Sequence, residues 1–176
     1  MPSMGIYSYE LFKFYDVDTI IRIGSAGTIS DKVDLRDIVL AMGTCTDSNY
    51  AMQYRLPGLY APIADFGLLH TAYEQAGLYG IWTEVGNVVS TDIFYNDNTE
   101  YNKSWSKMNV LAVEMESAAL YMNAARLSKR ALAMFTISDN LLNGGSLSVK
   151  ERQDGFDDMI KLSLETAVLS YVQGGK

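Results

Sequence analysis

The sequence has little of two residue types on which many functional sites depend. It contains one cysteine, Cys45, and one histidine, His70. A single cysteine cannot form a disulfide within the chain, so a reducing compartment is the simplest setting. His70 lies inside a predicted helix and is the only histidine, so the sequence predicts no metal site.

Further absences narrow the range of partners. No stretch is rich in lysine and arginine, and the net charge is -7, which argues against a nucleic-acid partner. No run approaches the ~20 apolar residues that span a bilayer. Residues 1–5 carry neither the basic nor the apolar part of a secretory signal. We therefore expect a cytoplasmic protein that binds neither nucleic acid nor a membrane.

What is present is the composition of a globular domain, with 48% hydrophobic and 20% charged residues. No repeat or linker divides the chain, so residues 1–176 are expected to form a single domain. Apolar periodicity predicts helices at 6–14, 64–76 and 116–127 and strands at 19–23, 37–42, 79–89 and 131–137. The glycines that follow the first strand, Gly24 and Gly27, predict a tight turn there.

A last helix is predicted after the capping box formed by Ser148 and Glu151. Its apolar residues recur at helical spacing and are expected to face the core. These residues are Phe156, Met159, Ile160, Leu164, Ala167, Val168 and Tyr171. Strands that alternate with helices predict an α/β fold with a largely parallel sheet, in which ligands bind beyond the C-terminal ends of the strands.

Arg22 lies inside the first predicted strand. A charge in a strand that is buried on both faces is costly unless it is paired. The guanidinium group suits a phosphate or a carboxylate. Ser25, at the strand end, could add its hydroxyl and backbone N–H to such an anion site. The alternative is an edge-strand arginine that is paired with a nearby carboxylate.

Glu114 and Glu116 stand at the entry to a predicted helix. They could simply compensate the helix dipole. They could instead accept hydrogen bonds from two neighbouring hydroxyls, such as those of a ribose, with Met115 against the apolar face of the sugar. Phe94 follows another strand and could stack on a flat ring or pack in the core.

Asp139 follows the strand at 131–137. Low solvent access there would raise its pKa and make it a proton donor at neutral pH, although it could also cap a turn. Arg152 lies in the first turn of the last helix, where a cation opposes the helix dipole. It is expected either to pair with a carboxylate such as Asp139 or to be a solvated surface residue.

Taken together, the motifs resemble the nucleoside phosphorylase family, specifically its hexameric, bacterial-type purine nucleoside phosphorylases. The motifs occur in the family's order and spacing, at residues 21–27, 42–48, 90–95, 113–116, 136–139, 151–153 and 157–160. The resemblance implies a three-layer fold with a mixed, largely parallel sheet flanked by helices. It also implies a homo-oligomer, a hexamer in the family.

The resemblance implies reversible phosphorolysis of purine (deoxy)ribonucleosides to the free base and (deoxy)ribose 1-phosphate, a glycosyltransferase step of purine salvage. Inorganic phosphate is the co-substrate and no cofactor is implied. The implied site residues are Arg22 and Ser25 for phosphate; Glu114, Met115 and Glu116 for ribose; Phe94, Val113 and Ser138 for the base; and Asp139, assisted by Arg152, as general acid on purine N7. Arg22 favours a phosphorylase over the related nucleosidases, and Asp139 favours a purine over uridine.

One departure from the family is expected at the N-terminus. Family members carry a longer segment before the position of Met1, with sheet strands, a glycine-containing phosphate loop and residues that reach into a neighbouring subunit. The domain is therefore expected to be incomplete there, with an exposed sheet edge and greatly reduced phosphorolysis by this chain alone. The alternatives are a non-catalytic remnant, a related nucleosidase or a uridine phosphorylase.

Overall fold

The fold is mixed α/β, as the alternation of apolar patterns predicts. The structure is a computed structural model and describes residues 1–174. Its strands are β1 (Thr19–Thr28), β2 (Ile38–Thr46), β3 (Thr83–Ser90), β4 (Ala112–Glu114) and β5 (Arg130–Asn140). Its helices are α1 (Pro2–Phe14), the 3-10 helix η1 (Asn49–Tyr54), α2 (Phe66–Tyr79), α3 (Tyr101–Ser106), α4 (Ser117–Arg126), α5 (Val149–Asp154) and α6 (Asp157–Gly174). No helix in this part of the chain combines the length and apolar character needed to cross a membrane.

Every helix and strand predicted from the sequence is present, whereas η1, α3 and β4 were not predicted. These three elements are short, with six, six and three residues, so their patterns contain too few periods to be recognised. The predicted turn after the first strand is wrong. β1 continues to Thr28, and a bulge between Ala26 and Gly27 replaces the turn.

The strands are joined in the order β1-β4-β3-β2-β5, and the sheet closes on itself. β1 with β5, β2 with β3 and β3 with β4 are parallel, while β1 with β4 and β2 with β5 are antiparallel. The mixed, largely parallel character agrees with the prediction, but a closed sheet differs from the predicted three-layer one. The register shifts in β1, between Ala26 and Gly27, and in β2, between Ala41 and Gly43, are those of bulges, which bend a strand locally.

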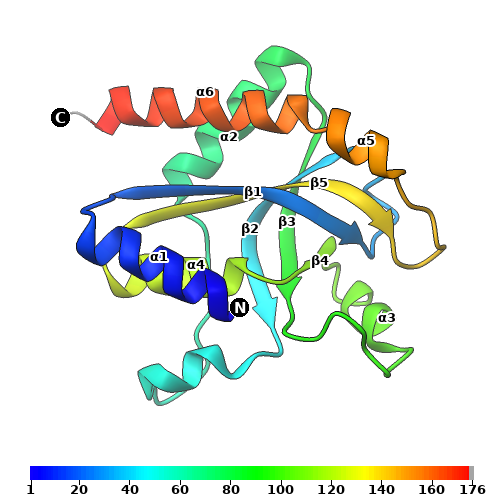
Figure 1. Cartoon of the computed structure of the whole chain (residues 1–176), viewed down its shortest axis with the longest axis horizontal. Coiled ribbons are helices and arrows are strands. Elements are labelled where there is room, and N and C mark those ends of the chain that lie inside the picture. The colour runs from blue at the N-terminus through cyan, green and yellow to red at the C-terminus, as the bar shows by residue number, and fades with distance from the viewer. Residues whose placement is uncertain (175–176) are drawn as a thin grey trace.

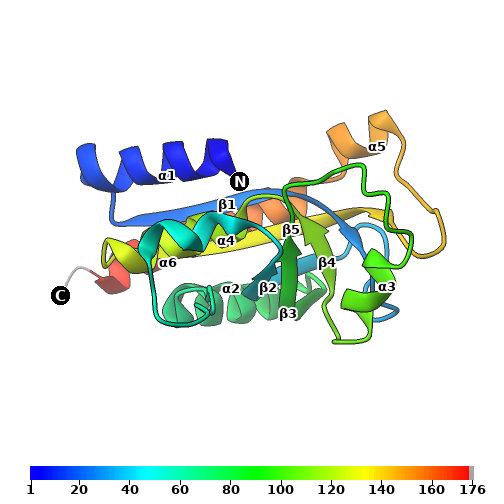
Figure 2. The same cartoon turned by 90° about the horizontal axis from the view of Figure 1, so that it is seen from below.

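Helices lie on two sides of the sheet. In Figure 1, α2 and α6 lie together on one side and α1 and α4 on the other. Figures 1 and 2 both place α3 and α5 at the same end of the molecule, near β4 and the end of β5. The sheet supplies much of the core, because β5 is buried from Ala131 to Ser138. This agrees with the fully apolar run predicted there.

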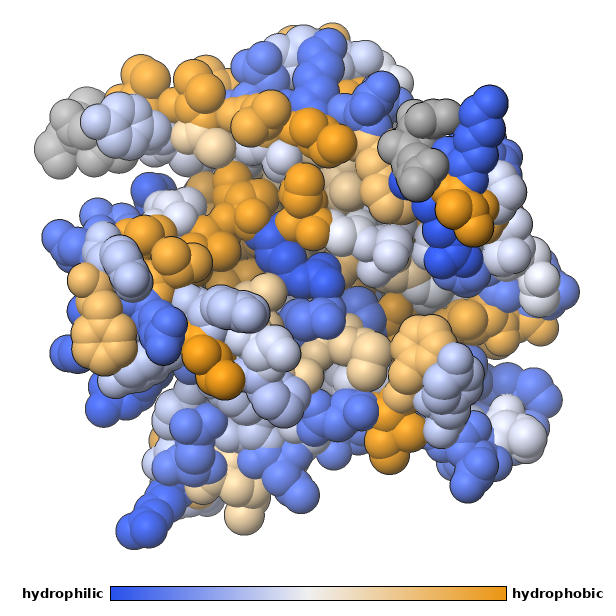
Figure 3. All heavy atoms as spheres, in the orientation of Figure 1, coloured by the Kyte–Doolittle hydropathy of each residue, from blue (hydrophilic) through white to orange (hydrophobic). Residues whose placement is uncertain are grey.

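The last helix differs from its prediction in two ways. It is split into α5 and α6, and most of its apolar stripe faces outward. Met159 is buried, but Ile160, Leu164, Val168 and Tyr171 are 42%, 62%, 60% and 83% exposed. We call these four residues the α6 stripe. Figure 3 shows apolar residues gathered along α6 and over the neighbouring part of β1.

The buried face of α6 contains Leu162, Ser163, Thr166 and Ser170. Ser163 and Thr166 donate their hydroxyl hydrogens to the carbonyls of Ile160 and Leu162. A hydroxyl that is satisfied within its own helix can be buried at little cost. Small residues on this face also let the helix approach the core closely, and the four apolar side chains of the α6 stripe are left outside.

One edge of β1 has no strand partner over most of its length in the described structure. β5 pairs with β1 from Thr19 to Thr28, whereas β4 pairs only with Gly27 and Thr28. Unpaired strand edges present free N–H and C=O groups to other chains. β1 runs alongside α6 (Figure 1).

Candidate active site

A cavity of about 760 Å³ opens where β1, β4 and β5 end. All ten residues predicted as site residues line it: Arg22, Ser25, Phe94, Val113, Glu114, Met115, Glu116, Ser138, Asp139 and Arg152. They come from β1, from the segment after β3, from β4 and the residues that follow it, from β5 and from α5. The location agrees with the general rule that ligands bind beyond the C-terminal ends of strands in such folds.

The Arg22 side chain folds back over its own strand. A Cβ atom at residue 24 would lie 2.8 Å from Arg22 Nη1, so a larger residue there would displace the guanidinium group from this position. The guanidinium also lies over the ring of Phe135, at 4.8 Å from its centroid. Gly24 therefore serves to position Arg22 rather than to form the predicted turn.

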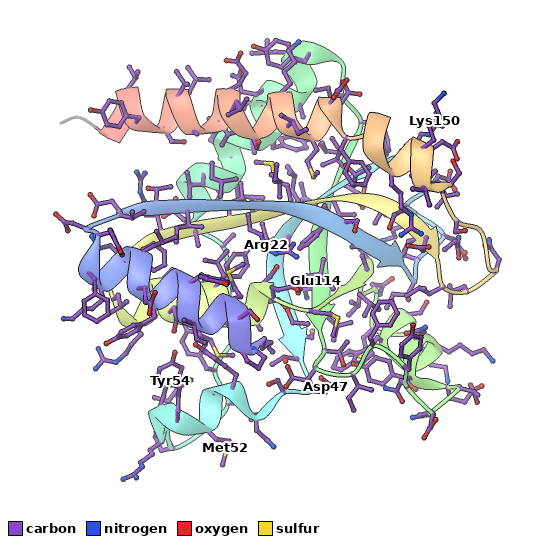
Figure 4. All side chains as sticks on the ribbon, in the orientation of Figure 1. Arg22, Asp47, Met52, Tyr54, Glu114 and Lys150 are labelled. Atoms are coloured by element: carbon purple, nitrogen blue, oxygen red, sulfur yellow. The ribbon has the colours of Figure 1, made fainter. Side chains whose placement is uncertain are left out.

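Arg22 pairs with two carboxylates of the cavity. Its Nη2 donates to Glu116 Oε2 at 2.5 Å, and its Nη1 lies 4.0 Å from Glu114 Oε2. Figure 4 shows Arg22 and Glu114 pointing toward one another. Nη1 is buried and has no hydrogen-bond partner among the described residues. The sequence left open whether Arg22 pairs with a carboxylate or binds an anion. The structure is compatible with both, since Arg22 is paired with carboxylates and still has a donor that an anion could satisfy.

Glu114 is almost completely buried, at 4% exposure. Its carboxylate accepts hydrogen bonds from the backbone N–H groups of Glu116 (2.9 Å) and Ser117 (3.0 Å) and from the Ser90 hydroxyl. Burial raises the pKa of the Glu114 carboxyl, while Arg22 and the hydroxyl of Ser90 act to lower it. Glu114 is thus fixed at the start of α4 and has little surface left for a ligand.

Glu116 differs from Glu114 in its exposure, since 34% of its side chain is accessible. Its Oε2 also accepts a hydrogen bond from the N–H of Met115 at 3.3 Å. Met115 and Val113 line the cavity beside it. The Glu114 carboxylate is therefore enclosed by the protein, whereas the Glu116 carboxylate is partly accessible at the cavity wall.

Asp139 and Arg152 form an ion pair, with 2.7 Å between Arg152 Nη2 and Asp139 Oδ1. The Ser138 hydroxyl donates to the other carboxylate oxygen at 2.7 Å, and Arg152 Nε donates to the carbonyl of Leu147 at 3.2 Å. The predicted pairing of Arg152 with Asp139 is present. Asp139 is 30% exposed, so it is less enclosed than a position after a buried strand led us to expect.

Phe94 is 73% exposed and lines the cavity, so the alternative of core packing is wrong. It contacts Tyr95 edge to face, with 4.9 Å between the ring centroids. The rest of this wall was missed by the sequence reasoning: Thr91, Ile93, Asn96, Asn98, Thr99, Tyr101 and Asn102. The available signal was the run of asparagines, whose side chains carry both a hydrogen-bond donor and an acceptor.

Asp47 forms hydrogen bonds with two residues of this wall, Thr91 and Tyr101. It accepts hydrogen bonds from Thr91 Oγ1 at 3.0 Å and from the Tyr101 hydroxyl at 2.8 Å. It is labelled in Figure 4, where it lies beyond the end of β2. Because one carboxylate binds two residues that are ten positions apart, it restrains both ends of the loop between them.

His70 and Cys45 take no part in the cavity lining. His70 lies on α2, stacks on Phe66 with 5.7 Å between ring centroids and is 3.5 Å from Glu74. In the part of the chain that the structure describes, no group of three or more His, Cys, Asp or Glu side chains is placed to hold a metal ion.

The fold and the cavity define a class of protein: an α/β chain whose cavity contains an arginine with a buried donor that has no partner among the described residues, a partly exposed carboxylate paired with that arginine, and an aspartate–arginine pair. The family model described as the phosphorylase superfamily matches residues 1–172. The chain therefore belongs to the phosphorylase superfamily.

Three curated relatives carry the name "Purine nucleoside phosphorylase DeoD-type". The chain is 45% identical over 168 residues to the protein of Geobacillus sp. (strain WCH70), with 96% of this chain and 71% of the relative covered. It is 46% identical over 168 residues to that of Alkaliphilus metalliredigens (strain QYMF), with 95% and 72% covered. It is 47% identical over 169 residues to that of Limosilactobacillus reuteri (strain DSM 20016), with 96% and 71% covered.

Proposed function

We propose that this chain is a purine nucleoside phosphorylase, which cleaves purine (deoxy)ribonucleosides reversibly with inorganic phosphate. The names of its relatives, at 45–47% identity over almost the whole chain, support the activity. The observation that carries the proposal is the shared cavity, because Arg22 with its unpartnered buried donor, the partly exposed carboxylate of Glu116 and the Asp139–Arg152 pair all line one space.

Phosphate is assigned to Arg22 and Ser25. Arg22 has a buried nitrogen without a partner among the described residues, and an oxyanion supplies the acceptor that this donor lacks. Ser25 lines the cavity on the same strand. The binding of a phosphate at Arg22 would compete with the Arg22–Glu116 pair and would leave the Glu116 carboxylate free.

The ribose is assigned to Glu116 and Met115. A freed Glu116 carboxylate can accept hydrogen bonds from two neighbouring sugar hydroxyls. Glu114 supports this part of the site from behind. Phe94, Val113 and Ser138 are assigned to the purine base, with the exposed ring of Phe94 available to stack on it.

In the reaction, a phosphate oxygen forms a bond to C1′ of the sugar while the bond from C1′ to N9 of the purine breaks. The electron pair of that bond goes to the base, and Asp139, which enters the step as the carboxylic acid, donates its proton to N7 and is left as the carboxylate that pairs with Arg152. Such proton transfer contributes on the order of 10²–10⁴ in rate. The negative charge of the phosphate also stabilises the cationic sugar. Arg152, paired with Asp139, holds the acid in place.

Two features of the setting belong to the same proposal. We assign the protein to the cytoplasm, because its one cysteine is suited to a reducing compartment. We also assign it to a homo-oligomer, a hexamer by resemblance to the family. The α6 stripe and the unpaired edge of β1 are apolar and hydrogen-bonding surfaces available for association.

The test is cleavage of inosine and adenosine by the purified chain, with and without phosphate. We expect release of free base that requires phosphate and yields ribose 1-phosphate, at a greatly reduced rate for this chain alone. Base release that is independent of phosphate and yields ribose would indicate a nucleosidase instead. Cleavage of uridine but not of purine nucleosides would indicate a uridine phosphorylase, and no cleavage of any nucleoside would indicate a non-catalytic remnant.

A further inference from the structure

Ser90, the last residue of β3, lies just behind the cavity without lining it. It is completely buried. Its hydroxyl donates to Glu114 Oε1 and accepts the backbone N–H of Ala118 at 2.9 Å. A third contact joins it to Thr44 Oγ1, also at 2.9 Å. A serine hydroxyl with three partners has no freedom left to rotate.

The hydrogens of this cluster can be assigned by counting donors. A hydroxyl has one hydrogen to donate, and that of Ser90 goes to Glu114. The contact between Thr44 and Ser90 therefore requires Thr44 to donate, a hydrogen that Thr44 shares with the carbonyl of Cys45. The cluster thus runs in one direction, from Thr44 on β2 through Ser90 on β3 to Glu114 on β4.

Glu114 connects this hydrogen-bonded cluster to the residues of the cavity. It accepts the N–H groups of Glu116 and Ser117 and faces Arg22 Nη1 at 4.0 Å. We propose that Ser90 is a positioning residue, which fixes the Glu114 carboxylate and thereby places Arg22 and Glu116 for phosphate and ribose. The kinetic part of this inference rests on the proposed function, whereas its structural part does not.

The electrostatic setting makes the Ser90 hydroxyl important. The groups that face Glu114 are Arg22 from β1, Glu116 after β4 and the phenol of Tyr121 from α4. Burial raises the pKa of Glu114, and the hydrogen bond from Ser90 opposes that rise. Without the hydroxyl, the buried carboxylate has one donor fewer and is protonated at higher pH. A neutral Glu114 no longer attracts Arg22.

The decisive comparison uses three variants. Ser90→Ala removes the donor to Glu114, and Thr44→Val removes only the outer hydroxyl of the cluster. Ser170→Ala is the control, because its buried hydroxyl lies on α6 and has no hydrogen-bond partner among the described residues. We expect Ser90→Ala to raise the KM for inosine and for phosphate about tenfold. We expect a smaller rise for Thr44→Val and none for Ser170→Ala.

A pH profile separates positioning from plain loss of stability. In Ser90→Ala the acid limb of kcat/KM should move to higher pH, and Ser90→Thr, which restores the hydroxyl, should move it back. An unshifted limb with a uniformly lower kcat would overturn the proposal.

Unfolding measured against pH tests the same idea without any activity. A folded-state pKa above the ordinary value of 4.5 means that stability falls as the pH rises through the interval between the two values. Ser90→Ala widens that interval, so its loss of unfolding free energy should grow from pH 4.5 toward neutrality. A loss that is the same at every pH would contradict the inference, whether or not the chain cleaves nucleosides.

Discussion

The cavity and the α6 stripe are built on the same sheet, but their side chains differ: those of the cavity are paired with partners, and those of the stripe are exposed. In the cavity each carboxylate is held by named donors, as in the pairs Arg22–Glu116 and Arg152–Asp139. The four residues of the α6 stripe are 42–83% exposed. Partly buried charges are costly unless they are partnered, whereas apolar contact depends on area alone. The cavity should therefore respond to the loss of single atoms, and the stripe should not.

The largest effect is expected at Asp139. Asp139→Asn removes the proton donor and should lower the rate of inosine phosphorolysis by on the order of 10²–10⁴. The matched substrate is 7-methylguanosine, whose base already carries a positive charge at N7 and needs no proton. Its rate should fall much less, as measured by base release at saturating phosphate. Equal losses for both nucleosides would mean that Asp139 acts by placing the base rather than by protonating it.

Arg22 comes next. Arg22→Ala should lower kcat/KM for phosphate by about 10²–10³, because it removes the charged donor group that the proposal assigns to this anion. Arg22→Lys should recover part of this loss, since lysine keeps the charge but not the fork of donors. Arg36→Ala is the control, because Arg36 is an exposed arginine paired with Glu151 outside the cavity. An equal loss in both alanine variants would point to overall charge rather than to the cavity.

Glu116 should show effects of opposite sign on the two substrates. Glu116→Gln releases Arg22 from its ion pair, so phosphate should bind more tightly, while inosine should bind about tenfold more weakly because a charged acceptor for its hydroxyls is lost. Titration calorimetry with each substrate alone measures both changes. If phosphate and inosine weaken together, Glu116 only maintains the shape of the cavity.

The sequence was sufficient where function depends on residue type within a short motif. Ten of the residues that line the cavity are predictable from such motifs, and the buried β5 follows from a mostly apolar run. Contacts between distant segments were not accessible. Ser90 is hydrogen-bonded to Glu114, 24 positions away, and Asp47 to Thr91, 44 positions away. The local sequence around these residues does not identify such distant partners.

The α6 stripe shows a different limit. Helical spacing of Ile160, Leu164 and Val168 identifies an apolar face, but periodicity does not say whether that face is covered. The face that is buried is marked by Ser163 and Thr166, whose hydroxyls are satisfied by the helix itself. A pattern based on hydropathy counts such residues as polar and assigns them to the outside.

The smallest effect is expected on the α6 stripe, and two leucines two positions apart, on opposite faces of the helix, allow a matched test. Leu164 is 62% exposed and Leu162 is fully buried. Leu162→Ala should lower the free energy of unfolding by about 2–5 kcal/mol, because it leaves a cavity in the core. Leu164→Ala should change it by less than about 0.5 kcal/mol, as for other exposed positions. Urea denaturation at several protein concentrations measures both.

A large loss at Leu164 that depends on protein concentration would show that a second chain covers the stripe in solution, because only association makes stability depend on concentration. The comparison between a cavity held by its own ion pairs and an uncovered stripe would then fail for the associated protein.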